Sequence, residues 1–147
     1  LNEADEIWLA SLWKSWVIDY LPQSISNLSN QFGVPIRIFG RKDFGAIESY
    51  EFMSIPSGQR ANYTQVASTE AIEISEKLNE VMSNYEWFHP LLSPLCGGDY
   101  SKCRIFTNDG LVISADGGHL TRVGVAESAI MLRNLLNTIS NSLQQRR

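Results

Sequence analysis

The hydrophobic positions of this chain recur with strand-like and helix-like spacing, and they predict alternating strands and helices. A short apolar run at residues 7–13 predicts a buried strand. Pro22 interrupts the helical pattern that follows, so we expect a regular helix to begin there and to end at Gly33. Residues 34–40 predict a second strand, and a strand–helix–strand unit usually pairs its strands in parallel. The helical pattern, including the part before Pro22, places on one side Val17, Tyr20, Leu21, Ile25, Leu28 and Phe32.

The middle of the chain is less regular. Residues 41–67 mix apolar and polar positions with glycine and proline, which indicates an irregular connection with one short helix. A helix capped by Ser68 or Thr69 is then predicted to continue to about residue 84. Residues 85–88 predict a short strand. The buried side of the helix is expected to carry Ala71, Ile72, Ser75, Leu78 and Met82.

The last third of the chain predicts a hairpin followed by a helix. Apolar runs at residues 104–107 and 111–114 flank the turn sequence at 108–110. The final helix is expected to start after Leu120, with Thr121 as its N-cap. This alternation of strands and helices predicts an α/β architecture. The apolar positions of the final helix are Ile130, Leu132, Leu135, Leu136, Ile139 and Leu143.

Composition narrows the possible partners. The chain has 147 residues, 44% of them hydrophobic, which suits one domain with one core. Its net charge of −4 argues against nucleic acid or an anionic membrane surface as a partner. No apolar run reaches the roughly 20 residues of a membrane span. The acidic start is not a signal peptide and lacks Met, so we expect any targeting segment to lie upstream.

Two cysteines, Cys96 and Cys103, are separated by six residues that include two glycines. This spacing permits a disulfide in an oxidising compartment, and it equally suits two free thiols in a cytosolic protein. A zinc site is disfavoured, because no nearby pair of histidines completes a tetrahedral ligand set. The spacing alone leaves the disulfide and the free thiols open.

The sequence Asp116-Gly117-Gly118-His119 lies between a strand-like run and the predicted final helix. An Asp in this position can orient the imidazole, and the imidazole can then take a proton from a serine. The two glycines would let the backbone fold back so that both side chains face one point. Asp-Gly-Gly is also a common turn sequence, and from these residues alone a turn without catalytic function is the simpler interpretation.

The block from Asp116 to Leu120, followed by Gly124, resembles the last sequence block of the SGNH (GDSL-type) serine hydrolases. The chain is most similar to the SGNH domains linked to membrane acyltransferases of bacterial surface polysaccharides. These domains share an ordered series of a strand ending near a Trp, a second strand, a cysteine loop and the Asp-x-x-His block. The counterparts here are residues 9–13, 36–40, 96–103 and 116–124, with Thr121 where the pattern often has Ser.

The resemblance implies a fold and a cellular location. The fold would be an α/β three-layer sandwich with a mostly parallel sheet, of the flavodoxin-like SGNH type. Residues 1–147 would form the C-terminal part of a single SGNH-like domain, incomplete on its N-terminal side. Because the relatives are exported, the resemblance favours a disulfide between Cys96 and Cys103 and a periplasmic or extracytoplasmic location. Free thiols would instead favour the cytoplasm.

The resemblance also implies hydrolysis or transfer of an acyl ester, expected to be acetyl, on a carbohydrate. Asp116 and His119 would supply the acid and base of a Ser-His-Asp triad. The Gly-Asp-Ser nucleophile block is absent, and its nearest match, at residues 98–101, lies in the cysteine loop. Trp13-Lys14-Ser15 follows the first strand in place of the usual oxyanion residues. The serine is therefore expected upstream, in a protein whose membrane acyltransferase domain would draw ultimately on acetyl-CoA; this domain itself would need no cofactor or metal.

Other interpretations stay open. The domain could be a non-catalytic carbohydrate-binding α/β module, or an unrelated α/β domain in which residues 116–119 form only a turn. We expect His89 to be packed or on the surface rather than catalytic. Arg37 and Arg41-Lys42 are expected to form a solvated rim. The tryptophans, which could stack on sugars, are expected to lie mostly in the core: Trp8, Trp13, Trp16 and Trp87.

Overall fold

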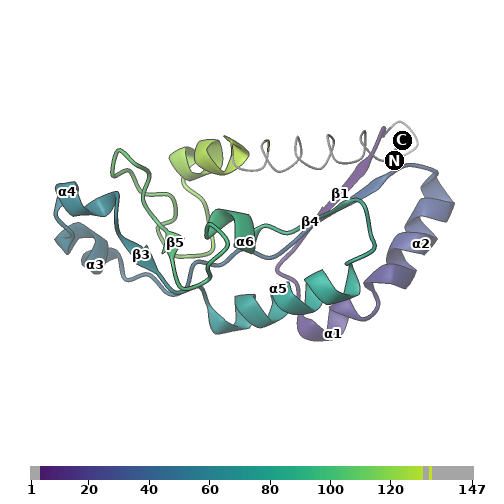
Figure 1. Ribbon diagram of the computed structural model, residues 1–147. Helices are drawn as coiled ribbons and strands as arrows, with labels where there is room; N and C mark the ends of the chain where they lie inside the picture. The colour runs from purple at the N-terminus through teal and green to yellow at the C-terminus, as the bar shows by residue number, and fades with distance from the viewer. Residues whose placement is uncertain (1–3, 131–132, 134–147) are drawn as a thin grey trace. The chain divides into compact units, whose positions relative to one another are not determined.

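The computed structural model describes residues 4–130 and 133, and the chain divides into two compact units (Figure 1). The sheet unit comprises Leu1–Arg41 and Thr69–Leu92. The loop unit comprises Lys42–Ser68 and Ser93–Arg147. The second unit interrupts the first in sequence, so the sheet unit is assembled from two separate stretches of chain.

The sheet unit contains a three-stranded parallel sheet in the order β1-β2-β4. Its strands are β1 (Ile7–Ala10), β2 (Ile36–Phe39) and β4 (Phe88–His89). The predicted parallel pairing of the first two strands and the α/β class are confirmed. The predicted strand at 85–88 is displaced, since only Phe88 belongs to β4. Tyr85 precedes the strand, and its hydroxyl donates to the carbonyl of Ile36 at 2.7 Å.

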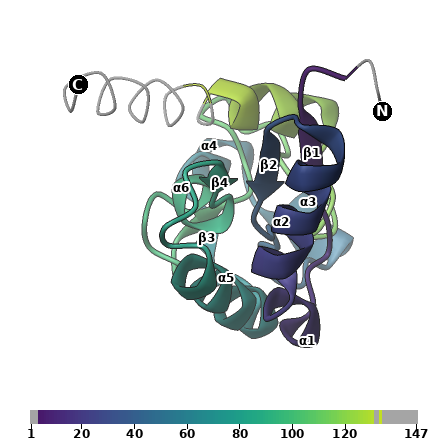
Figure 2. The ribbon, with the colours of Figure 1, turned by 90° about the vertical axis from the view of Figure 1, so that its right-hand side faces the viewer.

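Three helices accompany this sheet: α1 (Ser15–Ile18), α2 (Leu21–Phe32) and α5 (Thr69–Val81). Figure 2 shows α2 alongside β1 and β2. As predicted, α2 has Pro22 in its first turn and ends before Gly33, which has a left-handed backbone with φ of 66°. α5 begins at Thr69, so Ser68, one of the two predicted caps, precedes it, and it ends three residues before the predicted end at 84.

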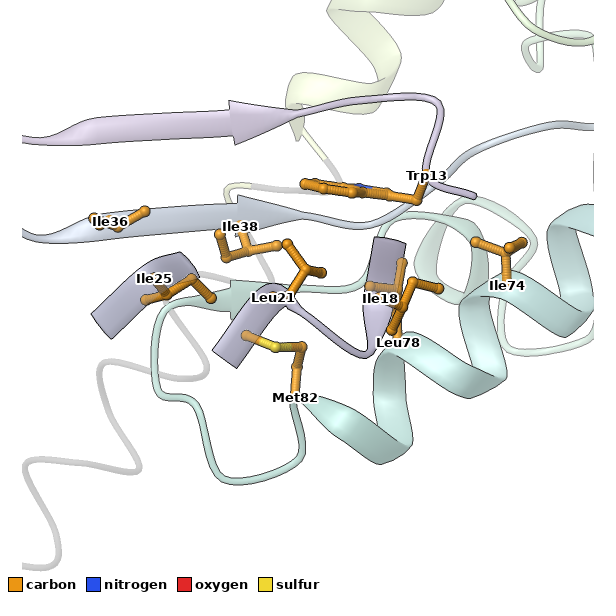
Figure 3. Close-up of a cluster of buried hydrophobic side chains, with 9 residues drawn as sticks. All are labelled: Trp13, Ile18, Leu21, Ile25, Ile36, Ile38, Ile74, Leu78 and Met82. Carbon is orange, nitrogen blue, oxygen red and sulfur yellow. The ribbon is translucent and has the colours of Figure 1, made fainter. Parts of the chain in front are cut away.

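The core of the sheet unit is a cluster of apolar side chains between one face of the sheet and the helices (Figure 3). Ile38 points from β2 toward Leu21 of α2, and Ile36, on the same strand, is buried as well. In α5 the buried side carries Ile74 in place of the predicted Ile72, which is only half-buried. The cluster consists of Trp13, Ile18, Leu21, Ile25, Ile36, Ile38, Ile74, Leu78 and Met82.

The strand predicted at residues 7–13 forms over Ile7–Ala10, but the prediction that it is buried is wrong. Successive side chains of a strand point to opposite faces, and only Ile7 and Leu9 of β1 pack against the core cluster. Trp8 is 64% exposed and Ala10 is exposed as well. Tyr20, expected on the buried side of the helix, is 68% exposed.

The loop unit is built from short elements. Two helices, α3 (Ser49–Ser54) and α4 (Ser57–Arg60), and the strand β3 (Thr64–Gln65) replace the single short helix expected in this region. β3 pairs antiparallel with β5 (Cys103–Arg104). The one-turn helix α6 (Leu92–Leu95) has its first residue in the sheet unit and the others in the loop unit. Phe106 is fully buried, and its ring meets that of Phe52 edge-on at 5.3 Å.

The predicted turn at residues 108–110 is confirmed. The amide of Thr107 donates to the carbonyl of Leu111 at 2.8 Å, and that of Gly110 donates to Thr107 at 3.0 Å. Beyond the turn, residues 111–114 form isolated bridges rather than a continuous strand. Residues 122–130 are helical, as predicted. The apolar positions predicted at Leu132, Leu135, Leu136, Ile139 and Leu143 lie outside the described residues.

Candidate acid–base site

The segment Asp116–His119 forms a closed loop in the loop unit. An antiparallel bridge between Ser114 and Leu120 joins the two ends of this loop. Ser114 is fully buried, and its hydroxyl donates to the backbone carbonyl of His119 at 2.7 Å. The amide of Thr121 donates to the carbonyl of Ile113 at 2.9 Å. These bonds fix the two ends of the loop. The conformation between them therefore depends on residues 116–119.

Within the loop, the side chains of Asp116 and His119 are brought together. The imidazole Nδ1 of His119 lies 2.7 Å from Oδ2 of Asp116. The other carboxylate oxygen, Oδ1, accepts the amide of His119 at 2.7 Å and that of Gly118 at 3.0 Å. One carboxylate therefore caps the turn with one oxygen and holds the imidazole with the other.

These hydrogen bonds further stabilise the charged form of the carboxylate. The backbone amide of His119, followed by its imidazole, lowers the pKa of Asp116 from 3.8 to about 2. Asp116 is therefore ionised near neutral pH, and a carboxylate can only accept hydrogen bonds. The proton of a neutral imidazole must then lie on Nδ1, which leaves the lone pair of Nε2 available as a base.

Gly117 is required by the shape of the loop. Its φ of 82° lies in the left-handed region, and a Cβ atom here would lie 1.9 Å from the carbonyl oxygen of Gly45. Gly118 has no such constraint, because the nearest atom to a Cβ there would be Oδ1 of Asp116 at 3.9 Å. The expectation that both glycines are needed for the fold-back therefore holds sterically only for Gly117.

Thr121 ends the loop and starts the helix at 122–130. Its Oγ1 accepts the amide of Gly124 at 3.0 Å and donates to the carbonyl of Val112 at 2.5 Å. The predicted N-cap is therefore formed, and a serine could make the same two bonds. A Cβ atom at Gly124 would lie 2.1 Å from the carbonyl oxygen of Ile113, which explains why this position carries glycine.

Two residues that the sequence analysis did not assign to the site also bind the loop. The amide of Phe44 donates to the carbonyl of Gly117 at 2.8 Å. The ammonium group of Lys42 donates to the carbonyl of Gly118. Lys42 is separated from Gly118 by 76 positions, so no local sequence pattern could have indicated this contact.

The imidazole is open on the side away from Asp116. The side chain of His119 is 92% exposed. Among the described residues, no serine hydroxyl is hydrogen-bonded to this ring. The hydroxyl of Ser101, from the near match to a nucleophile block, instead donates to Asp99 at 2.6 Å. The nucleophile is therefore not assembled at His119 within the described part of the chain.

Cys96 and Cys103 form a disulfide, so the bridge implied by the resemblance is confirmed.

In the described ranges, no three or more His, Cys, Asp or Glu side chains are placed to hold a metal ion. No helix of those residues is long and apolar enough to cross a membrane.

The remaining candidates lie in the sheet unit. His89 is packed, at 2% exposure, and its Nε2 lies 3.3 Å from Arg37. The expectation of a solvated rim is wrong for Arg41, which is buried at 4% exposure and paired with Glu70. Hydrogen bonds from Arg41 and Lys14 lower the pKa of Glu70 to about 2.

The tryptophans differ from the expectation that most would lie in the core. Trp13 is buried, and its indole nitrogen donates to the carbonyl of Phe39 at 2.6 Å. Trp8 and Trp16 are exposed. Trp87 is half-buried beneath the guanidinium group of Arg37, which lies 4.4 Å from the ring centroid.

No protein-family model matches this chain, and no curated protein is significantly similar to it. The geometry of the loop and the resemblance of its sequence are therefore what support a function.

Proposed function

We propose that Asp116 and His119 are the acid–base pair of a Ser-His-Asp site that hydrolyses or transfers an acyl ester on a carbohydrate. The observation that carries this proposal is the 2.7 Å contact between Nδ1 of His119 and an ionised Asp116, on a ring that is otherwise open. The serine would come from outside residues 1–147.

The chemistry follows from the tautomer. Nε2 of His119 takes the proton of the serine hydroxyl as the oxygen attacks the ester carbonyl, and Asp116 stabilises the imidazolium that forms. The imidazolium then returns its proton to the departing alcohol, which leaves an acyl group on the serine. Water or an acceptor hydroxyl next gives a proton to Nε2 and attacks the acyl carbon. The bond between that carbon and the serine oxygen then breaks, and the imidazolium returns its proton to the serine oxygen. Water makes the protein an esterase, and a sugar hydroxyl makes it an acyltransferase.

The wider setting of the proposal comes from the resemblance to the SGNH domains linked to membrane acyltransferases. Parallel strands and a helix-covered sheet face are compatible with the three-layer SGNH sandwich. The disulfide between Cys96 and Cys103 is compatible with a periplasmic or other extracytoplasmic location. An acyltransferase domain in the membrane would supply the acyl group, ultimately from acetyl-CoA.

The test is labelling of the complete natural polypeptide with a fluorophosphonate probe, followed by peptide mapping. We expect the label on one serine outside residues 1–147, and we expect His119→Ala to abolish it. Asp116→Asn should also weaken the label. Asp99→Asn is its matched control and should leave the label unchanged, because Asp99 is another exposed carboxylate whose pKa is lowered to about 2, mainly by Ser101. Label that persists in His119→Ala would contradict the proposal.

A second candidate is a non-catalytic carbohydrate-binding module. The exposed rings of Trp8 and Trp16 favour it, because flat aromatic faces in solvent can stack on sugars. Binding of acetylated saccharides by the folded protein, lost in Trp8→Ala or Trp16→Ala and accompanied by no serine label, would select this candidate over the enzyme.

A further inference from the structure

Two peptide groups of the loop donate hydrogen bonds to Asp116. They are the amide of Gly118, at 3.0 Å, and the amide of His119, at 2.7 Å. A peptide group is planar, and its carbonyl points away from its N–H. The carbonyls of these two groups belong to Gly117 and Gly118, so whatever binds those oxygens also sets the direction of the two amides.

Both carbonyls are bound by one distant segment. The backbone amide of Phe44 donates to Gly117, and the ammonium group of Lys42 donates to Gly118. Phe44 and Lys42 are thus each connected to the carboxylate of Asp116 by a chain of two hydrogen bonds that passes through one peptide group. The contact from Phe44 is made by the backbone, whereas the contact from Lys42 depends on its side chain.

Lys42 also brings a positive charge to the loop. The residue is half-buried, and burial lowers the pKa of its ammonium group below 10.5, while Asp116 and Asp43 act in the opposite direction. A cation on a peptide carbonyl polarises the whole group, which makes the N–H on its far side a stronger donor. That N–H belongs to His119 and faces Asp116.

We propose that Lys42 is a positioning residue of the acid–base pair. Its ammonium group holds and polarises the peptide group between Gly118 and His119, and this keeps the carboxylate of Asp116 directed at the imidazole. The inference rests on the proposed function, because Lys42 serves catalysis only if the pair itself does.

The test is an NMR comparison of Lys42→Met with the unchanged chain. The carboxyl carbon of Asp116 is followed against pH, and the amide proton of His119 is followed at neutral pH. In Lys42→Met we expect the pKa of Asp116 to rise from about 2 toward 3.8 and the His119 amide proton to move upfield as its bond weakens. Lys42→Arg keeps the cation and a donor, so we expect it to restore both signals toward their original values.

Lys102→Met is the matched control, since Lys102 is an exposed lysine that pairs with Asp99 at 3.0 Å. It should raise the pKa of Asp99 and leave Asp116 unchanged. An Asp116 titration that is the same in Lys42→Met as in the unchanged chain would overturn the proposal. Should Lys42→Met fail to fold, Lys42→Gln takes its place under the same criteria.

These readouts need no turnover, so they separate the two proposals. An altered Asp116 titration together with a serine label that survives His119→Ala would keep the positioning contact and reject the function. An unaltered titration together with a label that His119→Ala abolishes would keep the function and reject the role of Lys42.

Discussion

The core of the sheet unit and the loop at Asp116–His119 are stabilised by different kinds of contact. Leu78 and its neighbours in the core are held by burial of apolar surface, which depends on volume and on periodicity along the chain. The loop is held by backbone hydrogen bonds, by one carboxylate and by the close approach of Gly117 to Gly45. The pattern of hydrophobic residues therefore determines the structure of the core. The structure of the loop depends instead on particular hydrogen bonds and on one close backbone contact.

The largest expected effect of a single substitution lies in the core. Leu78→Ala removes a fully buried side chain, and we expect a loss of about 3 kcal/mol in the free energy of unfolding. Leu111→Ala, at an exposed leucine in the loop unit, should change it by no more than about 0.5 kcal/mol. Denaturant unfolding measures both values. Equal losses would mean that burial does not distinguish these positions.

The next effect should come from the loop glycines. In Gly117→Ala a left-handed backbone must accept a Cβ that collides with Gly45, and we expect a loss of about 2 kcal/mol. Gly118→Ala should stay within about 1 kcal/mol of the unchanged chain. Thermal unfolding of the two variants, side by side, measures the difference. Indistinguishable transitions would contradict the assignment of the fold-back to Gly117.

The difference between burial and specific contacts also explains which parts of the structure could be predicted from the sequence. Periodicity predicts α2 and α5, because each helix depends on neighbours a few positions away. The strand–helix–strand order predicts the parallel pairing of β1 with β2. Periodicity placed the strand predicted at 85–88 too early, since β4 is Phe88–His89. It also predicted that Ile72 is buried where the structure buries Ile74, because burial of a helix residue depends on which side of the helix packs against the sheet. The two short helices within residues 41–67 lacked a stripe long enough to be recognised.

In the site, the spacing of Asp116 and His119 was sufficient to predict that the two side chains could meet. Thr121 was recognised as a cap for the same local reason. Lys42 and Phe44 were missed because they act across more than seventy positions through backbone carbonyls. The exposure of the imidazole could not be anticipated either, since it depends on what the rest of the chain leaves uncovered.

A smaller effect concerns pH. The pKa of Asp116 is lower in the folded chain than its usual 3.8, so its stabilising contribution is complete above 3.8 and is lost as the pH falls through about 2. The difference in unfolding free energy between the unchanged chain and Asp116→Asn should narrow over this range. Other carboxylates titrate alike in both chains and cancel. A difference that stays constant down to pH 2 would contradict the lowered pKa.

The most direct test of the acid–base pair is the imidazole nitrogen spectrum of His119 at neutral pH. The chain has only two histidines, so His89 provides an internal reference. We predict that the neutral form of the ring carries its proton on Nδ1 in the unchanged chain and in Asp99→Asn, and that this preference is lost in Asp116→Asn. A ring protonated on Nε2 in the unchanged chain, or one insensitive to Asp116→Asn, would show that Asp116 does not orient His119.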